Sequence, residues 1–320
     1  MAMTLNDMKV GMSDKVSQHV VDIFVRESEI LQALPFDNCV SPMGGSTLTY
    51  TYMQTMLPSV ATFRGLNTEY EANEATLVKK AADLKIFGGK FSMDRVLKQA
   101  EGKFNNMAFQ MEQKIKAAVG LFHYTLINGD ATTNALEFDG LDKMLAGTTS
   151  EFNATGSIDI STMALLKENA DQLYEMLQNL IKATDADALL MNTSMISKIQ
   201  TMARILGYKT DSEEAFGRKI TSMDGIRFMD LKNTYSQGDG AAVASPCIPI
   251  VEGVTDIYAV KFDLNDGFHG VTLTGNSGIS QYVPNFNDPG AVKDGEVEMV
   301  AATVLKNTAH AGVLRNIKLI

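Results

Sequence analysis

The sequence of 320 residues contains no tryptophan, two cysteines and seven prolines, and it has no apolar run long enough to span a bilayer. Cys39 and Cys247 are too few for a disulfide framework, and neither has the spacing typical of zinc ligands, so we expect two free thiols. The first residues lack an apolar segment followed by a small-residue cleavage site. We therefore expect a folded protein that is made and retained in the cytoplasm.

Positive charge is scarce. The 28 Lys and Arg residues are outnumbered by 38 Asp and Glu residues, which gives a formal net charge of -10. Affinity for a phosphate backbone comes mainly from clustered Lys and Arg, so this balance argues against a nucleic-acid reader. Any contact with DNA should be weak and non-specific. The hydrophobic content of 45% and charged content of 21% are typical of folded globular proteins.

Complete nucleotide-binding loops are also missing. The glycine-glycine-lysine segment at 88–90 has Leu84 where a phosphate-binding loop needs its first glycine. The glycine-aspartate-glycine segment at 238–240 has Val243 at the third glycine position of a dinucleotide fingerprint, and no strand-to-helix pattern surrounds it. We interpret the segment at 238–240 as a flexible surface loop, and we assign a bound nucleotide to neither segment.

Catalytic and metal-binding patterns are equally sparse. A turn-rich segment carries acidic residues whose spacing does not match an EF-hand loop, and local turns and caps explain them better: Asp130, Glu137, Asp139 and Asp142. The histidines are scattered, without a partner at metal-ligand spacing: His19, His123, His269 and His310. There is no nucleophile elbow and no catalytic signature around either cysteine. We assign no catalytic, cofactor-binding or metal-binding residue.

The first third of the chain predicts a short arm followed by a long hairpin. Apolar residues at helical spacing indicate an amphipathic helix within 13–34, which Pro35 ends. From 46 to 55 the pattern alternates, with Leu48, Tyr50 and Tyr52 on one face, which predicts a strand. A polar stretch over 57–76 and an extended segment over 77–91 complete the hairpin. A connection this long is unusual in a compact domain and favours a protruding loop that grips something.

The remainder indicates an α+β protein with several small sheets. Apolar residues three or four apart predict one helix over 94–128, about 50 Å long, and a short helix over 141–145 follows in a loop region. Ser161 or Thr162 begins another helix, and a strand at 188–191 precedes a helix over 193–206 that Gly207 ends. Strands are expected at 227–231, 257–262, 271–274 and 279–283. Two antiparallel strands, at 296–305 and 313–320, would flank a turn at 310–312.

The order of these elements resembles that of the major capsid proteins of tailed bacteriophages, the Hong Kong 97-type family that also includes encapsulins. The stretches GGSTLTYTY at 44–52 and LKIFGGKFSMDRVL at 84–97 are similar to the two arms of the family's extended loop and its junction with the spine helix. INGDATTNALEFDGLDKML at 127–145 resembles the segment after the spine, although Asp139 stands where the family often has proline. ALLMNTSMISKIQTMARIL at 188–206 and the last 25 residues resemble the axial helix unit and the closing strands.

The resemblance implies an N-terminal arm at 1–45, an extended loop hairpin at 46–92, and a peripheral domain with its spine helix at 93–158. An axial domain at 159–285 and a return to the peripheral domain at 286–320 would follow. The implied function is structural: a non-enzymatic subunit that self-assembles through hexameric and pentameric capsomers into an icosahedral head enclosing double-stranded DNA. A separate scaffold protein, a portal and weakly held DNA would be its partners, with no membrane. It would be assembled in the host cytoplasm and located in the virion.

Two alternatives stay open. An encapsulin, a cellular nanocompartment shell, would share the fold. An α+β hydrolase using the acidic loop 130–142 belongs to a different class and would form a small soluble oligomer.

The resemblance also sharpens what we expect of the hairpin. Glu69, Glu71 and Glu74 at its tip outnumber the single cation Arg64, so these residues should contact a basic surface on a neighbouring subunit. Some family members join subunits through a lysine on the extended loop, whereas the tip at 57–76 contains none, so we expect a non-covalent shell. Only 45 residues precede the first strand, so we expect no cleaved N-terminal scaffold segment.

Overall fold

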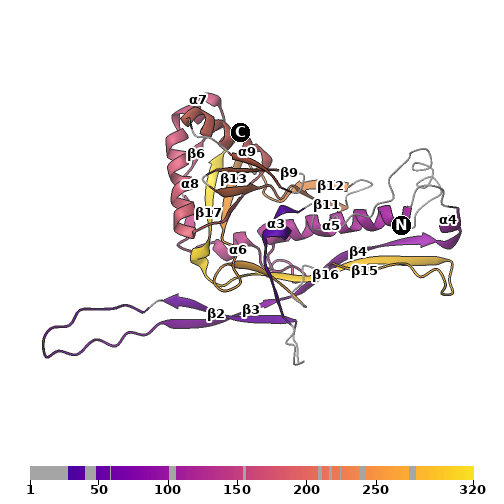
Figure 1. The fold of residues 1–320 in the computed structure, drawn as a ribbon, viewed down its shortest axis with the longest axis horizontal. Coiled ribbons are helices and arrows are strands. Elements are labelled where there is room, and N and C mark those ends of the chain that lie inside the picture. Colours follow the sequence, from indigo (N-terminus) through magenta and orange to yellow (C-terminus); the bar gives the residue numbers. More distant parts are fainter. Residues whose placement is uncertain are drawn as a thin grey trace.

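A computed structural model describes residues 28–39, 48–57, 59–100, 106–153, 156–207, 211–215, 218–223, 225–237, 242–273 and 279–320. Two sheets form most of it, and a separate two-stranded hairpin extends far from the rest of the molecule (Figure 1). Among the described residues, no helix is long and apolar enough to span a bilayer. Both cysteines are free thiols, as expected.

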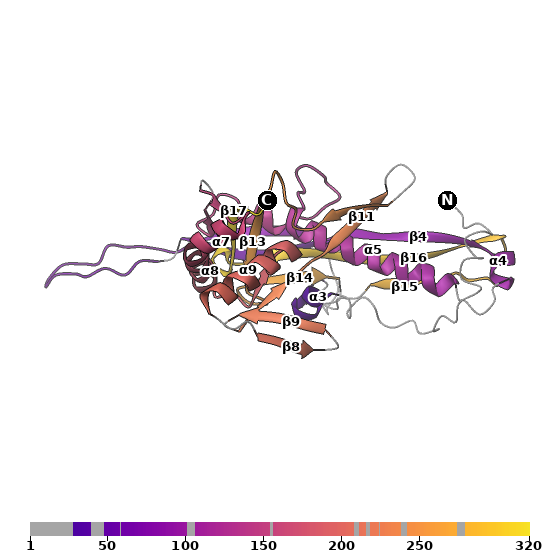
Figure 2. The same ribbon diagram turned by 90° about the horizontal axis from the view of Figure 1, so that it is seen from above.

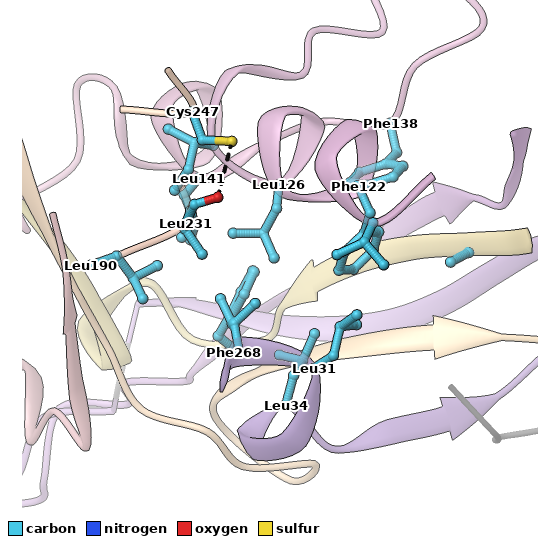
Figure 3. Packing of buried hydrophobic residues seen from close by; sticks show 14 of the residues in the cluster. Leu31, Leu34, Phe122, Leu126, Phe138, Leu141, Leu190, Leu231, Cys247 and Phe268 are labelled. Atoms are coloured by element: carbon cyan, nitrogen blue, oxygen red, sulfur yellow. Dashed lines mark hydrogen bonds between the residues drawn. The ribbon is translucent and has the colours of Figure 1, made fainter. Parts of the chain in front are cut away.

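The first sheet has five strands and lies against the helix α5 (Asn106–Asn128), which runs along it (Figure 1). Its longest strand, β16, pairs with three others. The strands are β1 (Phe36–Asn38), β14 (Phe268–Thr272), β16 (Val292–Leu305), β15 (Ser280–Tyr282) and β4 (Lys85–Asp94). Phe122 and Leu126 of α5 are fully buried beside the short helix α3 (Glu29–Ala33), as Figure 3 shows.

The second sheet has eight strands and separates two hydrophobic cores. Its strands are β5 (Glu151–Phe152), β6 (Ile158–Asp159), β17 (Ala311–Lys318), β13 (Val254–Val260), β7 (Ala188–Leu190), β10 (Ile226–Met229), β9 (Arg218–Met223) and β8 (Asp211–Ala215). Side chains alternate along a strand, so Leu190 faces the core around α5 and Leu189 faces the other core. Helices α7 (Met163–Glu168), α8 (Ala170–Thr184) and α9 (Thr193–Leu206) contribute to that second core.

The remaining elements connect these layers. The hairpin consists of β2 (Thr49–Leu57) and β3 (Thr76–Asp83), and a second hairpin of β11 (Asn233–Gln237) and β12 (Ala242–Pro246) lies beside α5. The short pieces are α4 (Arg95–Gln99), α6 (Leu141–Leu145) and the 3-10 turn η1 (Thr308–His310).

Several expectations are confirmed locally. The helix α9 spans the predicted residues, because the Asn192 side chain accepts from the Met195 amide at 2.9 Å and Gly207 ends the helix with φ of 79°. The short helix α6 and the strand β7 also form where expected. The predicted helix within 13–34 lies mostly outside the described residues, and its described part is α3, which ends before Pro35.

Three expectations were wrong. The described residues do not form one helix over 94–128: α4 ends at Gln99, α5 is described from Asn106, and residues 101–105 lie outside the described residues. The helix expected from Ser161 or Thr162 is divided at Asn169 into α7 and α8, although Thr162 does cap the first part. The two C-terminal strands do not pair with each other: β16 belongs to the first sheet and β17 to the second.

The extended segment predicted over 77–91 is also divided. Its first part, β3, pairs with β2 in the hairpin, whereas its second part, β4, pairs with β16 over ten residues. Leu84 lies between them and is buried. The hairpin therefore leaves the body directly from the edge of the first sheet.

Candidate assembly surfaces

The hairpin of β2 and β3 is held at one end and free at the other. Its strands pair from Thr49 opposite Asp83 to Leu57 opposite Thr76, and no other described strand pairs with either of them. Figures 1 and 2 show it extending away from the body in both views. An isolated two-stranded hairpin is only marginally stable in water. Its exposed length therefore needs either strong anchoring or a partner.

Three hydrogen bonds anchor the root of the hairpin. The Tyr50 hydroxyl donates to the Asp37 carboxylate at 2.8 Å, and the Leu84 amide donates to the Leu48 carbonyl at 2.7 Å. Lys85 Nζ donates to the Ala135 carbonyl at 2.9 Å. Burial, followed by the bond to Asp37, raises the pKa of Tyr50, so its phenol stays protonated and donating. These contacts fix the direction in which the hairpin leaves the body.

The hairpin tip, residues 59–75, contains all of the sequence-predicted contact residues. The Arg64 guanidinium lies over the Tyr70 ring at 5.3 Å, and it donates to the Thr68 carbonyl at 3.2 Å. The predicted glutamates Glu69, Glu71 and Glu74 are exposed. Within the described residues no ion pair joins Arg64 to any of them, so the tip presents its negative charge to the outside. Their contact with a neighbouring subunit stays a prediction.

The tip also exposes large apolar side chains that sequence reasoning missed. Phe63 is fully exposed, and Val60, Leu66 and Tyr70 are each more than half exposed. Apolar side chains gathered on a projecting loop are typical of a surface that another molecule covers. The signal was visible in the sequence, since Phe63 and Leu66 interrupt an otherwise polar stretch.

A groove of about 760 Å³ lies at the root of the hairpin; we call it the root groove. One wall comes from the inward face of the hairpin, with Tyr52 and Lys80. The other wall comes from the segment 131–149, with Asp139, Lys143 and Met144. Lys143 is held by Asp130 at 2.5 Å and by Asp139 at 2.7 Å. The lining of the groove is therefore mixed: apolar side chains lie among lysine, aspartate and threonine side chains.

A second groove, of about 1000 Å³, lies between α5, the start of α9 and the β11–β12 hairpin. Its walls are largely apolar, with Ile248 and Ile250 among them, and Tyr235 is exposed at its rim. Lys116 on this wall already pairs with Glu112 at 2.9 Å.

The acidic residues that could have formed a hydrolase site have structural partners instead. Asp130 and Asp139 form ion pairs with Lys143, and the Glu137 carboxylate accepts from the side-chain amide of Asn134 at 2.8 Å. Hydrogen bonds from Lys143 and two threonines hold the pKa of Asp130 well below its usual range. Among the described residues, no group of His, Cys, Asp and Glu could hold a metal ion.

The fourth acidic residue, Asp142, belongs to a network centred on Arg315 of β17. Arg315 Nη1 contacts Asp142 at 2.7 Å and Asp256 at 2.9 Å, and its Nε donates to Glu151. The side chain of Arg315 is 17% exposed, and its partners come from α6, β13 and β5. Burial raises the pKa of Asp256, whereas hydrogen bonds, first from the Gly147 amide, lower that of Glu151. The network ties the separate elements α6, β5, β13 and β17 together.

The other sequence candidates also have structural roles. Gly88 lies in β4, where an added Cβ would meet the Val297 carbonyl oxygen at 1.9 Å, so this glycine permits close strand pairing. His123 on α5 is buried between Ser28 and Leu231. Burial raises the pKa of the Cys247 thiol to about 12, which keeps it unreactive. His19 and the segment 238–240 lie outside the described residues.

Comparison with known proteins gives matches by structure but none by sequence. No family model and no curated protein matches the sequence. Among solved structures, the chain is similar to the holo-SrpI encapsulin complex from Synechococcus elongatus PCC 7942, with 13% identity, a TM-score of 0.60, and coverage of 99% of this chain and 96% of that one. It is similar to the capsid of a native GTA particle with 9% identity, a TM-score of 0.59, and coverage of 95% and 94%.

A third match is a chain from Mycobacterium phage Bobi, with 12% identity, a TM-score of 0.56, and coverage of 100% of this chain and 99% of that one. Because the matches extend over nearly the whole of each chain, they concern the complete architecture. The protein has the Hong Kong 97-type fold of phage capsids and encapsulins, as its sequence pattern predicted. At sequence identities of 9 to 13%, this structural similarity establishes the fold alone.

Proposed function

We propose that this chain is the major capsid protein of a tailed bacteriophage, a subunit that self-assembles into an icosahedral head enclosing double-stranded DNA. The observation that carries the proposal is the hairpin, which displays Phe63 and Leu66 on a two-stranded stem that the subunit itself does not cover. Exposed apolar surface of this kind is costly unless a partner buries it. The fold supports a second copy of the chain as that partner. The role is structural and involves no catalysis.

Assembly of a closed shell explains why modest contacts suffice. Each subunit meets several neighbours in hexameric and pentameric capsomers, and many weak symmetric contacts add around a closed surface. A separate scaffold protein and a portal would guide assembly in the host cytoplasm, and the product would be the virion capsid. The net charge of -10 fits a shell that touches packaged DNA only weakly.

The domain division expected from the sequence is part of this proposal. The arm 1–45 and the loop 46–92 would reach over neighbouring subunits, while 93–158 and 286–320 would form the peripheral domain. Residues 159–285 would form the axial domain around the capsomer axis. The second hydrophobic core, between α8, α9 and the eight-stranded sheet, draws most of its residues from this last segment.

The direct test is assembly of recombinant protein, alone and with a scaffold protein. Electron microscopy and light scattering should detect closed shells or free capsomers. A protein that remains a monomer or simple dimer under all salt, crowding and scaffold conditions would contradict the proposal. That result would favour the alternative function, an α+β hydrolase that forms a small soluble oligomer.

An encapsulin-type nanocompartment remains the second candidate, because the fold matches an encapsulin and a GTA capsid almost equally, with TM-scores of 0.60 and 0.59. The contents of particles purified from the native source distinguish the two. Nuclease-protected genomic DNA supports the phage head. A protein cargo without DNA supports the nanocompartment.

A further inference from the structure

We propose that the hairpin tip of one subunit docks into the root groove of a neighbouring copy of the same chain. This inference rests on the proposed function, because it requires adjacent subunits. It assigns a specific acceptor surface to the charged and apolar tip residues. Three properties of the described residues support the assignment: reach, chemical match and symmetry.

The tip cannot occupy its own root groove. Eight residue steps separate Thr49 from Leu57 along β2, and the tip continues for about as many again before the chain turns near Gly65. At about 3.3 Å per residue, the turn lies roughly 50 Å from the root. Figure 1 shows the tip pointing away from the body. A hairpin tip that fills the root groove must therefore belong to another copy of the chain.

The apolar parts of the two surfaces correspond. The tip offers Phe63, Leu66 and Tyr70, which have large side chains exposed to solvent. The root groove offers the Tyr52 ring and the Met144 side chain along its walls. Aromatic side chains that enter a partner's pocket commonly supply most of the binding free energy of an interface.

The charges also correspond. The root groove is lined by Lys80, Lys85 and Lys143 on the positive side, and by Asp83 and Asp139 on the negative side. Asp139 is occupied by Lys143, and Asp83 accepts from the Thr49 hydroxyl at 2.7 Å. Among the described residues, Lys80 and Lys85 form no ion pair, and the Lys85 ammonium contacts a carbonyl. These two cations are available to the tip glutamates.

The groove beside α5 is a weaker acceptor. Lys116 there is already paired with Glu112, and Asp230 in the same lining accepts from the Thr193 hydroxyl while adding negative charge. Lys232 is the remaining cation in the lining of this groove that could contact an acidic tip. The root groove offers more uncommitted positive charge.

The symmetry of a tip-to-root contact suits a capsomer. The contact joins two different surfaces, so each subunit gives one tip and receives one. Repeated around an axis, such a contact closes a ring without leaving an unused tip. Rings of five and of six subunits can both use it, since each contact involves only two neighbours.

The test is a charge reversal with a matched control on the same strand. Lys80 faces the root groove, whereas its neighbour Lys79 lies on the opposite, outward face of β3, opposite Met53. Both are exposed, so Lys80→Glu and Lys79→Glu change the same charge on different faces. A third variant reverses the tip by replacing Glu69, Glu71 and Glu74 with Lys. A fourth combines this reversed tip with Lys80→Glu.

The measurement is the protein concentration that gives half-maximal assembly, with circular dichroism and the melting temperature as folding controls. Like charges at a contact are unfavourable, so Lys80→Glu and the reversed tip should each raise this concentration at least about tenfold. Lys79→Glu should leave it within about twofold. The combined variant should return it toward the wild-type value, because a positive tip then meets a more negative groove.

Loss of assembly by Lys79→Glu but not by Lys80→Glu would overturn the inference, since the outward face would then be the docking surface. Lack of rescue in the combined variant, with all folding controls normal, would overturn it as well. In both cases the wild-type protein still forms shells, and the proposed function stands. If the wild type forms neither shells nor capsomers, the proposed function fails first.

Discussion

The buried histidine on α5 gives the sharpest prediction about stability. His123 is 7% exposed, its Nε2 accepts from the Ser28 hydroxyl at 2.7 Å, and its Nδ1 donates to the Leu231 carbonyl at 3.1 Å. Ser28 is also the N-cap of α3, because its hydroxyl oxygen accepts from the Leu31 amide. These bonds suit a neutral ring. A charged ring would be buried without a counter-charge in these hydrogen bonds, and its Nε2 would have to donate to Ser28 rather than accept from it.

The pKa of this ring follows from its surroundings. Burial lowers the pKa of His123 to about 4, while the hydrogen bond to the Leu231 carbonyl opposes the shift. Of the nearby charges, Lys232 lowers the pKa further and Asp230 raises it. An unfolded chain would protonate the same ring near pH 6.5.

The sign of the pH dependence follows. Below about pH 6.5 the unfolded chain takes up a proton that the folded chain refuses, so acid favours unfolding. The contribution of His123 to the free energy of unfolding is complete above pH 6.5 and falls as the pH decreases toward 4. Below pH 4 the loss levels off at roughly 3 kcal/mol.

The variant His123→Gln isolates this contribution. A glutamine amide can donate to Leu231 and accept from Ser28, but it has no proton to gain. Urea unfolding of unassembled subunits at fixed protein concentration, from pH 7 to pH 4, measures both proteins. The wild type should lose roughly 3 kcal/mol more than the variant over this range. Other groups that titrate in this range, including the carboxylates and buried His269, contribute to both proteins and cancel. Parallel pH profiles for the two proteins would refute the reasoning.

Other predictions concern assembly and the Arg315 network. Replacing Phe63 and Leu66 with Ser should impair assembly yet leave the free energy of unfolding within about 0.5 kcal/mol, as measured by electron microscopy and urea unfolding. Replacing Arg64 and the three tip glutamates with Ala should weaken assembly and its salt dependence without changing circular dichroism; an unfolded variant would defeat this interpretation. Arg315→Leu should lower the free energy of unfolding by about 3 kcal/mol at neutral pH, because it leaves its carboxylate partners unpaired; an unchanged urea midpoint would contradict this. Finally, shells boiled in detergent and reductant should release monomers, and a ladder of multimers would show covalent joining.

Local structure was largely readable from the sequence. The helix α9 has an N-cap asparagine, an apolar stripe and a terminal glycine, and each acts within a few residues of the element that it defines. The alternating tyrosines predicted the strand β2, and Tyr50 and Tyr52 do share the face that packs toward the body. The order of such elements along the chain resembled that of the capsid family, and this resemblance was enough to predict the fold.

The tertiary structure alone decided how the elements pair. The segments β3 and β4 are consecutive extended strands, and nothing local assigns the first to the hairpin and the second to the main sheet. Likewise β16 and β17 share a strand pattern but lie in different sheets. Alternation shows which side chains share a face, whereas the strand partner depends on which distant surface buries that face. The root groove depends on the same long-range packing, since Lys80 and Lys143 face one space only after the hairpin is anchored beside α6.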